Sequence, residues 1–215
     1  MQLSRVYYHG GSRRLLSSPR FQSFFEECRL LAQKKSVDSF VHVRAATLAH
    51  REKHGCGAYP HSNGALLGAL AAAADAKRIL ELGTALGYTA LSLAHGASKA
   101  VIDTVERDGE HVRLARGNIE AAGMNGRVVV HEGDFANVLP TLEPGYDLVF
   151  FDGSSPVPRL HAELHRIMRP RGLLVTANLN HGGTADAVCE ALLDERAWLT
   201  AFVDDAGETA ISIKL

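Results

Sequence analysis

Hydrophobic positions in the first third of the chain recur at helical spacing. Between residues 21 and 35, and again between 37 and 53, apolar side chains fall at i, i+3, i+4 and i+7, with polar residues between them. A third apolar segment, rich in alanine and leucine, follows a glycine-containing break at residues 55–60. The pattern therefore predicts three helices before any strand, at Phe21–Lys35, Val37–Lys53 and Ser62–Ala74.

From residue 78 onward, short apolar runs alternate with helix-length amphipathic segments. The runs predict five buried strands, at Ile79–Leu82, Val101–Val105, Val128–Val130, Leu148–Phe151 and Leu173–Thr176. The clearest helices between them are Glu110–Ala122 and Pro156–Met168. Strands that alternate with helices form a parallel sheet through right-handed crossovers.

The end of the chain has a different pattern. Trp198–Val203 and Thr209–Leu215 both resemble strands, and the short link between them permits only an antiparallel hairpin. We therefore predict an α/β protein with a doubly wound seven-stranded sheet, made of five parallel strands and a C-terminal antiparallel hairpin. We expect a single domain, in which residues 1–57 form an arm and helices and residues 58–215 form the core.

The segment Arg78–Leu91, RILELGTALGYTAL, predicts a buried strand, a glycine turn and the start of a helix. Gly83 and Gly87 permit a sharp turn and the close approach of a ligand. Their GxxxG spacing differs from the GxGxxG of dinucleotide-binding proteins, which argues against a nicotinamide oxidoreductase. Glu81, at the end of the strand, suits a cationic ligand group better than it suits a phosphate.

Two further acids follow the next two predicted strands. Glu106 ends the second strand about 20 residues beyond the turn, where an acid accepts hydrogen bonds from ribose hydroxyls. Asp134 follows the third strand, where it could accept from an adenine amino group. Each acid alone is more simply a surface carboxylate. Together with Glu81 they make three acids at consecutive strand ends of one sheet, which indicates a binding site.

The order and spacing of these motifs resemble the class I methyltransferases, and within them the catechol O-methyltransferase-like O-methyltransferases, over roughly residues 58–215. Further landmarks of the resemblance are YPHSNGALL, GDF before LP, YDLVFFDG and ANLNHGG. The resemblance implies a class I methyltransferase fold with extra N-terminal helices, and S-adenosylmethionine as methyl donor. It implies donor-binding roles for Glu81, Gly83, Thr84, Gly87, Tyr88, Thr89, Glu106, Asp134, Phe135 and Asp152, with Glu106 at the ribose and Asp134 and Phe135 at the adenine.

The acceptor side departs from the family pattern. Relatives hold Mg²⁺ with an Asp after the fourth strand and an Asp-Asn pair after the fifth, and here Asp152 and Asn178 match. Ala177 replaces the second Asp, and Ser155 stands where a lysine is usual. Because a lost carboxylate weakens Mg²⁺ binding, the sequence disfavours metal dependence without excluding it.

Asp152 is the leading candidate for a catalytic role, whether it contacts metal, donor or acceptor. Asn178 serves either the acceptor site or the backbone of its own loop. His181, in the loop after the fifth strand, is a candidate base because histidine titrates near neutrality. Ser155 before Pro156 is more simply a helix N-cap. His61, His161 and His165 are weaker candidates, the last two on a helix face.

These residues predict an S-adenosylmethionine-dependent O-methyltransferase that acts on a small hydroxylated, phenolic-type acceptor. The alternative is a catalytically lapsed S-adenosylmethionine-binding protein with a regulatory or partner role, which the changes at Ala177 and Ser155 motivate. Nitrogen acceptors also stay open.

The composition limits the class of protein and the compartment that we expect. The 215 residues are 46% hydrophobic and 22% charged, with a net charge of −1, so we expect a globular protein without general nucleic-acid binding. Three scattered cysteines give no disulfide framework and no zinc-ligand spacing, which favours the cytoplasm. No apolar run predicts a membrane span. The acid-free, arginine-containing start resembles a transit peptide, although a flexible arm is simpler. The N-terminal helices would cover the acceptor or form a homodimer face.

Overall fold

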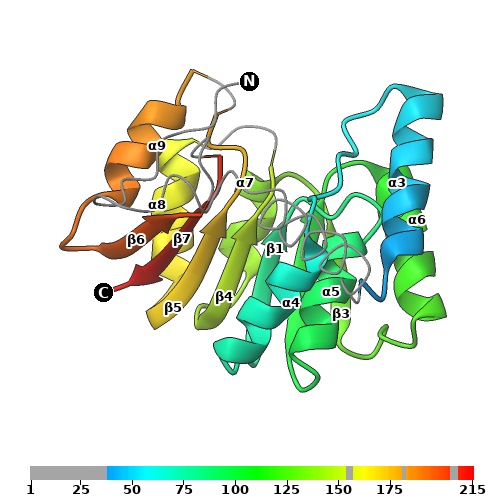
Figure 1. Cartoon of the computed structure of the whole chain (residues 1–215), viewed down its shortest axis with the longest axis horizontal. Coiled ribbons are helices and arrows are strands. Elements are labelled where there is room, and N and C mark those ends of the chain that lie inside the picture. Colours follow the sequence, from blue (N-terminus) through cyan, green and yellow to red (C-terminus); the bar gives the residue numbers. More distant parts are fainter. Residues whose placement is uncertain (1–37, 154–156, 181–182, 204–207) are drawn as a thin grey trace, which may run out of the picture. The chain divides into compact units, whose positions relative to one another are not determined.

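A seven-stranded sheet forms the centre of the computed structural model, which describes residues 38–153, 157–180, 183–203 and 208–215 (Figure 1). The strand order is β3-β2-β1-β4-β5-β7-β6. The first five strands are parallel, whereas β7 runs antiparallel to both β5 and β6. The strands are β1 (Arg78–Leu82), β2 (Val101–Glu106), β3 (Val128–Glu132), β4 (Tyr146–Phe151), β5 (Met168–Thr176), β6 (Trp198–Phe202) and β7 (Ala210–Lys214). The predicted sheet is confirmed.

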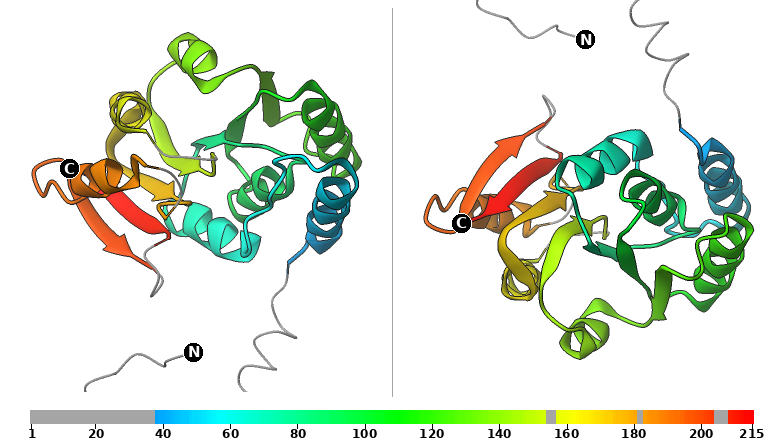
Figure 2. Two further views of the ribbon diagram at one scale, coloured as in Figure 1. Left: turned by 90° about the horizontal axis from the view of Figure 1, so that it is seen from above. Right: turned by 90° about the horizontal axis from the view of Figure 1, so that it is seen from below.

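Helices cover both faces of this sheet, as the two views of Figure 2 show. They are α3 (Val41–His54), α4 (Gly64–Ala73), α5 (Tyr88–Gly96), α6 (Gly109–Ala121), α7 (Phe135–Val138), α8 (Pro158–Ile167) and α9 (Ala185–Leu192), with a 3₁₀ turn at Leu139–Thr141. The predicted helix Phe21–Lys35 lies outside the described residues. In the part of the chain that is described, no helix has the length and apolarity needed to cross a bilayer.

Alternate side chains of each buried strand enter one of two hydrophobic cores. Ile79 of β1 packs into the core that also contains residues of α3–α6, while Leu80 packs into the core beneath α7–α9. Both cores exist because successive strand residues point to opposite faces. Both faces of these strands are covered, so their residues do not alternate between apolar and polar. This explains why the predicted strand segments are apolar throughout.

One strand begins well before its predicted position. β5 starts at Met168, which pairs with Tyr146 of β4, and the helix predicted to reach Met168 ends at Ile167. The polar residues that follow Met168 hid this part of the strand, because they lie on an exposed, irregular stretch. Arg171 there has a φ of 63°, and the β4–β5 register shifts.

Helices α4 and α5 meet through their backbones. A Cβ added at Gly96 would lie 1.9 Å from the carbonyl oxygen of Gly68, and one added at Gly68 would lie 2.8 Å from that of Ser92. Rigid backbone cannot yield by rotating a side chain. The pair therefore fixes how closely α5, which starts at the glycine turn, packs against α4.

We expect Gly96→Ala to destabilise the protein by about 1–3 kcal/mol, because overpacking forces backbone shifts. The control is Gly117→Ala on α6, where an added Cβ meets nothing within 4 Å. That substitution should raise the free energy of unfolding by up to about 1 kcal/mol through helix propensity. Urea unfolding measures both variants, and equal effects would contradict the packing argument.

Candidate functional site

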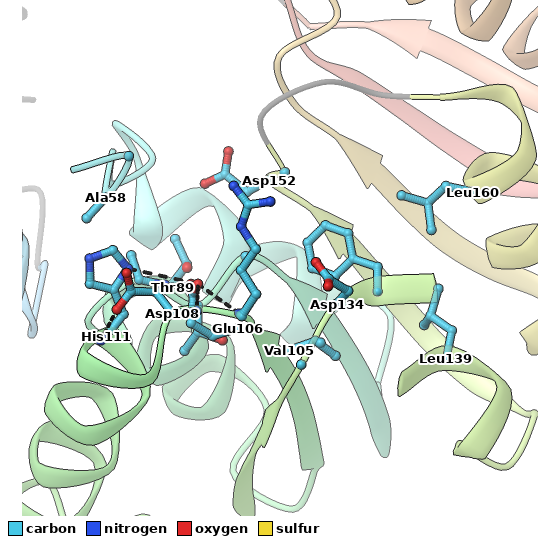
Figure 3. A pocket seen from close by; sticks show the side chains of 18 of the residues that line it. Ala58, Thr89, Val105, Glu106, Asp108, His111, Asp134, Leu139, Asp152 and Leu160 are labelled. Atoms are coloured by element: carbon cyan, nitrogen blue, oxygen red, sulfur yellow. Dashed lines mark hydrogen bonds and ion pairs between the residues drawn. The ribbon is translucent and has the colours of Figure 1, made fainter. Parts of the chain in front are cut away.

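The carboxyl ends of the central strands surround a cavity of about 860 Å³ (Figure 3). Between β1 and β4 the strand order reverses, and ligands of such sheets bind in the crevice at this point. The volume falls in the range of small-molecule sites. Predicted residues that line the cavity are Gly83, Thr84, Tyr88, Thr89, Glu106, Asp134, Phe135 and Asp152.

The glycine turn brings the end of β1 against the end of β4. Gly83 has a φ of 101°, and a Cβ added there would lie 2.8 Å from the carbonyl oxygen of Asp152. Gly87 precedes α5 with a φ of 91°. Ala85 between them also has a positive φ, of 45°, which a residue with a side chain rarely adopts. No residue pattern around Ala85 predicts this strained conformation.

Glu81 is fully buried next to the turn and is not among the residues that line the cavity. Its Oε2 accepts a hydrogen bond from Oγ1 of Thr104 at 2.5 Å. Its Oε1 is buried without a partner among the described atoms. Burial raises the pKa of Glu81 to about 8, although the Thr104 hydroxyl opposes this shift. A cationic group near Oε1 would favour the ionised form.

Glu106 is held at the rim of the cavity by backbone donors. Its Oε2 accepts from the amide of Ala85 at 2.9 Å, and its Oε1 accepts from the amides of Arg107 and Asp108 at 2.9 and 3.0 Å. These bonds fix the carboxylate in place and connect β2 to the glycine turn. The carboxylate keeps further acceptor capacity for ligand hydroxyls.

Asp134 and Phe135 stand beyond the end of β3. Asp134 is exposed and precedes α7 without capping the helix with its side chain. The ring of Phe135 packs edge-on against that of Phe151, with 6.2 Å between ring centroids. In Figure 3, Leu139 and Leu160 lie on the side of the cavity opposite His111, which gives it one apolar wall.

The side chain of Tyr88 joins three segments near the cavity. Its hydroxyl donates to Oδ2 of Asp38 at 2.6 Å and accepts from the amide of Gly64 at 3.0 Å. Burial raises the pKa of Tyr88 to about 12, so it stays protonated at neutral pH. The hydroxyl therefore holds α5 to α4 and to the start of α3.

Asp152 and Asn178, the two residues that match the family's metal positions, are in direct contact. Nδ2 of Asn178 donates to Oδ1 of Asp152 at 3.1 Å and to the carbonyl oxygen of Gly153 at 2.9 Å. Burial raises the pKa of Asp152 to about 7, and the bond from Asn178 opposes this rise. Asn178 has a φ of 61°, a conformation that asparagine tolerates better than most residues.

This pair fits poorly with Mg²⁺, whose binding the sequence already disfavours. Mg²⁺ requires an octahedral set of oxygen ligands. Here a single carboxylate faces the amide nitrogen of Asn178, and the adjacent Ala177 is buried and has no ligand atom. The chemistry of the donor set therefore argues against a metal at this position.

The candidate histidines lie in different environments. His181 and Ser155 are outside the described residues. His161 and His165 lie on α8 against Trp198, with ring centroids 5.3 and 4.9 Å from the indole. His61 packs edge-on against Phe150, and its Nδ1 accepts from the amide of Asn63. None of the last three is among the residues that line the cavity.

Several residues of the site had no signal in the sequence. Oγ1 of Thr104 lies 2.6 Å from that of Thr84 and so connects Glu81 to the cavity wall. Nδ2 of Asn118 donates to the carbonyl oxygen of Leu86 at 2.8 Å, which holds the glycine turn from α6. His111 and Arg159 also line the cavity. These residues come from distant segments, so no local spacing identifies them.

Glu81→Gln should change how stability depends on pH. The folded protein holds a proton on Glu81 up to about pH 8, whereas the unfolded chain releases it near the ordinary pKa of 4.5. The folded state binds more protons in this window, so wild-type stability falls as pH rises. Glutamine cannot ionise, so we expect the free energy of unfolding of the variant to gain on the wild type between about pH 5 and pH 9.

Urea unfolding at several pH values measures this difference, in which the parallel contribution of Asp152 cancels. A constant difference between the two proteins would contradict the assignment of a raised pKa to Glu81.

Comparison with known proteins places the geometry in context. The chain matches the model of a family described as O-methyltransferase over residues 35–199. A putative O-methyltransferase of Mycobacterium sp. (strain JLS) is 36% identical over 135 residues, which cover 61% of this chain and 61% of that protein. The catechol O-methyltransferase of Mycobacterium tuberculosis (strain ATCC 25618 / H37Rv) is 36% identical over 123 residues, or 56% of each chain. The chain thus covers less than two thirds of the length of either relative.

Solved structures give a similar result. The O-methyltransferase TomG from Streptomyces achromogenes, involved in tomaymycin synthesis and solved in complex with SAM, superposes with a TM-score of 0.70. It is 25% identical, and the match covers 80% of this chain and 88% of that one.

Proposed function

Because this chain belongs to the O-methyltransferase family, we propose that it transfers the methyl group of S-adenosylmethionine to a hydroxyl of a small phenolic acceptor. Its doubly wound sheet is the class I methyltransferase fold. The name of the Mycobacterium tuberculosis relative, a catechol O-methyltransferase, supports the phenolic acceptor. So does the apolar wall of the cavity, since small-molecule sites are mostly apolar with a few placed polar groups.

One observation carries the proposal: acids at the ends of three consecutive strands gather around a glycine turn beside a single cavity. Glu106, fixed by three amides, would accept from the ribose hydroxyls. Phe135 offers an apolar ring for the adenine, and Asp134 an acceptor for its amino group. The unpartnered Oε1 of Glu81 fits a site for positive charge.

When bound, the donor supplies an electrophilic methyl group on a positively charged sulfur. Glu81 and Asp152 both lie close to the glycine turn, and burial raises the pKa of each carboxyl. A cation beside them favours their ionised forms, so these carboxylates select for positive charge. Gly83 and Thr89 would border the methionine part.

Asp152 is the group that we assign as proton acceptor for the substrate hydroxyl. A base works best when its pKa lies near the working pH, and burial raises the pKa of Asp152 to about 7. Asn178 orients it through the bond to Oδ1. Leu139 and Leu160 would exclude water from the cavity. This assignment uses no metal, in keeping with the donor set described above.

Calorimetric titration with S-adenosylhomocysteine tests the donor site. We expect saturable binding by the wild type and an affinity about 10- to 100-fold lower for Glu106→Ala, because bonds to a charged acceptor are lost. Glu190→Ala, an exposed position on α9, is the matched control and should bind as the wild type does. Absence of binding by the folded wild-type protein would refute the proposal.

Asp152→Asn tests the base. With catechol as acceptor, we expect kcat to fall by about 10²–10⁴-fold. For the wild type, kcat/KM for the donor should rise with pH through about 7, where the carboxylate of the free enzyme ionises, and the variant should lose this rise. A rate that a chelator abolishes and Mg²⁺ restores would instead assign proton removal to a metal. Donor binding without transfer to any phenol would favour the lapsed, regulatory alternative.

A further inference from the structure

Two histidines and a cysteine converge at the rim of the cavity, on the side of Glu106. His50 lies on α3, Cys56 follows the end of that helix, and His111 lies in the first turn of α6. One ligand atom from each, nitrogen or sulfur, lies within 4.8 Å of the other two. The rings of His50 and His111 meet edge-on, with 5.3 Å between their centroids.

We propose that His50, Cys56 and His111 form a binding site for a transition-metal ion of the Zn²⁺ class. Two imidazoles and a thiolate are the ligand types that Zn²⁺ prefers, whereas Mg²⁺ and Ca²⁺ prefer oxygen. Three protein ligands leave the fourth tetrahedral position to water. The site is separate from the Asp152 and Asn178 pair, and it does not depend on the proposed methyl transfer.

The geometry requires only a small closure. Ligand atoms around tetrahedral Zn²⁺ are roughly 3.5 Å apart, so the side chains must approach by about 1 Å. His50 and Cys56 are only half-buried. Gly55 and Gly57 flank the cysteine, and a Cβ added at either meets nothing within 4 Å. The two glycines therefore leave open space on either side of Cys56, whose own side chain packs against the core that contains residues of α3–α6.

His111 is the fixed member of the set. Asp108 caps α6 by accepting from the amides of Glu110 and His111 at 2.9 and 3.1 Å, which holds the histidine backbone. The carboxylates of Asp108 and Glu110 also interact electrostatically with His50, so they would add negative charge around a bound cation. Oε1 of Glu106 lies 3.9 Å from Nδ1 of His111. At this distance the carboxylate forms no hydrogen bond with the ring but adds further negative charge near it.

An ion at this position would have a structural effect. Helix α3 buries only Val43 and Thr47, so its apolar attachment to the core is small. An ion bound by His50, Cys56 and His111 would join α3 and its following loop to α6. Gly57, Ala58 and Tyr59 of this loop line the cavity beside His111, so the ion would also fix part of the cavity rim.

The full chain, purified without a polyhistidine tag and stripped with a chelator, is titrated with Co²⁺ and then with Zn²⁺. We expect a single ion per chain and a thiolate-to-cobalt charge-transfer band. Cys56→Ser should abolish the band and weaken Zn²⁺ binding at least about tenfold, since even outer-shell changes weaken metal sites by this much. Cys189→Ser, another half-buried cysteine on α9, should leave both unchanged.

His50→Gln provides a second variant that keeps the thiol and should weaken Zn²⁺ binding similarly. Because a ligand of the folded state raises stability, Zn²⁺ should raise the Tm of the wild type and of Cys189→Ser but not of Cys56→Ser. No stoichiometric binding by the wild type, or a charge-transfer band that survives in Cys56→Ser, would overturn the proposal. None of these readouts depends on donor binding or turnover, so they separate this site from the proposed function.

Discussion

The contact between the ends of β1 and β4 determines the rest of the site. Gly83 has no side chain, so its Cα lies directly against the backbone of Asp152, and the two strand ends can face one crevice. The same approach buries the carboxylates of Glu81 and Asp152 near each other and raises both pKa values. Both groups are ionised at neutral pH only at an energetic cost, which a cation beside them offsets. The backbone contact thus supports the proposed binding of a positively charged donor at this place.

The sequence predicts this arrangement well because parallel sheets impose strong constraints. A strand covered on both faces must be apolar, and the carboxyl ends of parallel strands must share one edge. The five apolar runs and the acids Glu81, Glu106 and Asp134 therefore placed the crevice without a structure. The same reasoning placed the start of β5 too late, at Leu173, because the residues of the strand before Leu173 are not an apolar run. Pairing with Tyr146, and not residue type, extends that strand to Met168.

Features that depend on contacts between distant segments escaped prediction. The φ of Ala85 follows from the bond between its amide and Glu106, and alanine itself has no preference for that conformation. The His50, Cys56 and His111 cluster is a stronger case. Counting cysteines argued against a metal site, because Cys56 has no partner at zinc-finger spacing. The histidines that meet it belong to α3 and α6, and only the packing of these helices brings them together.

Glu106 connects the two proposed sites physically. Its carboxylate faces the cavity, accepts three backbone amides and lies 3.9 Å from His111. An ion on His111 would add positive charge beside this carboxylate and make it a weaker acceptor for the hydroxyls of a ligand. It would also hold the cavity rim at Gly57–Tyr59, which reduces the ordering that a ligand must impose. These two effects oppose each other. If the charge of the ion beside Glu106 has the larger effect, the ion weakens ligand binding in the cavity. If the ordering of Gly57–Tyr59 has the larger effect, the ion strengthens it.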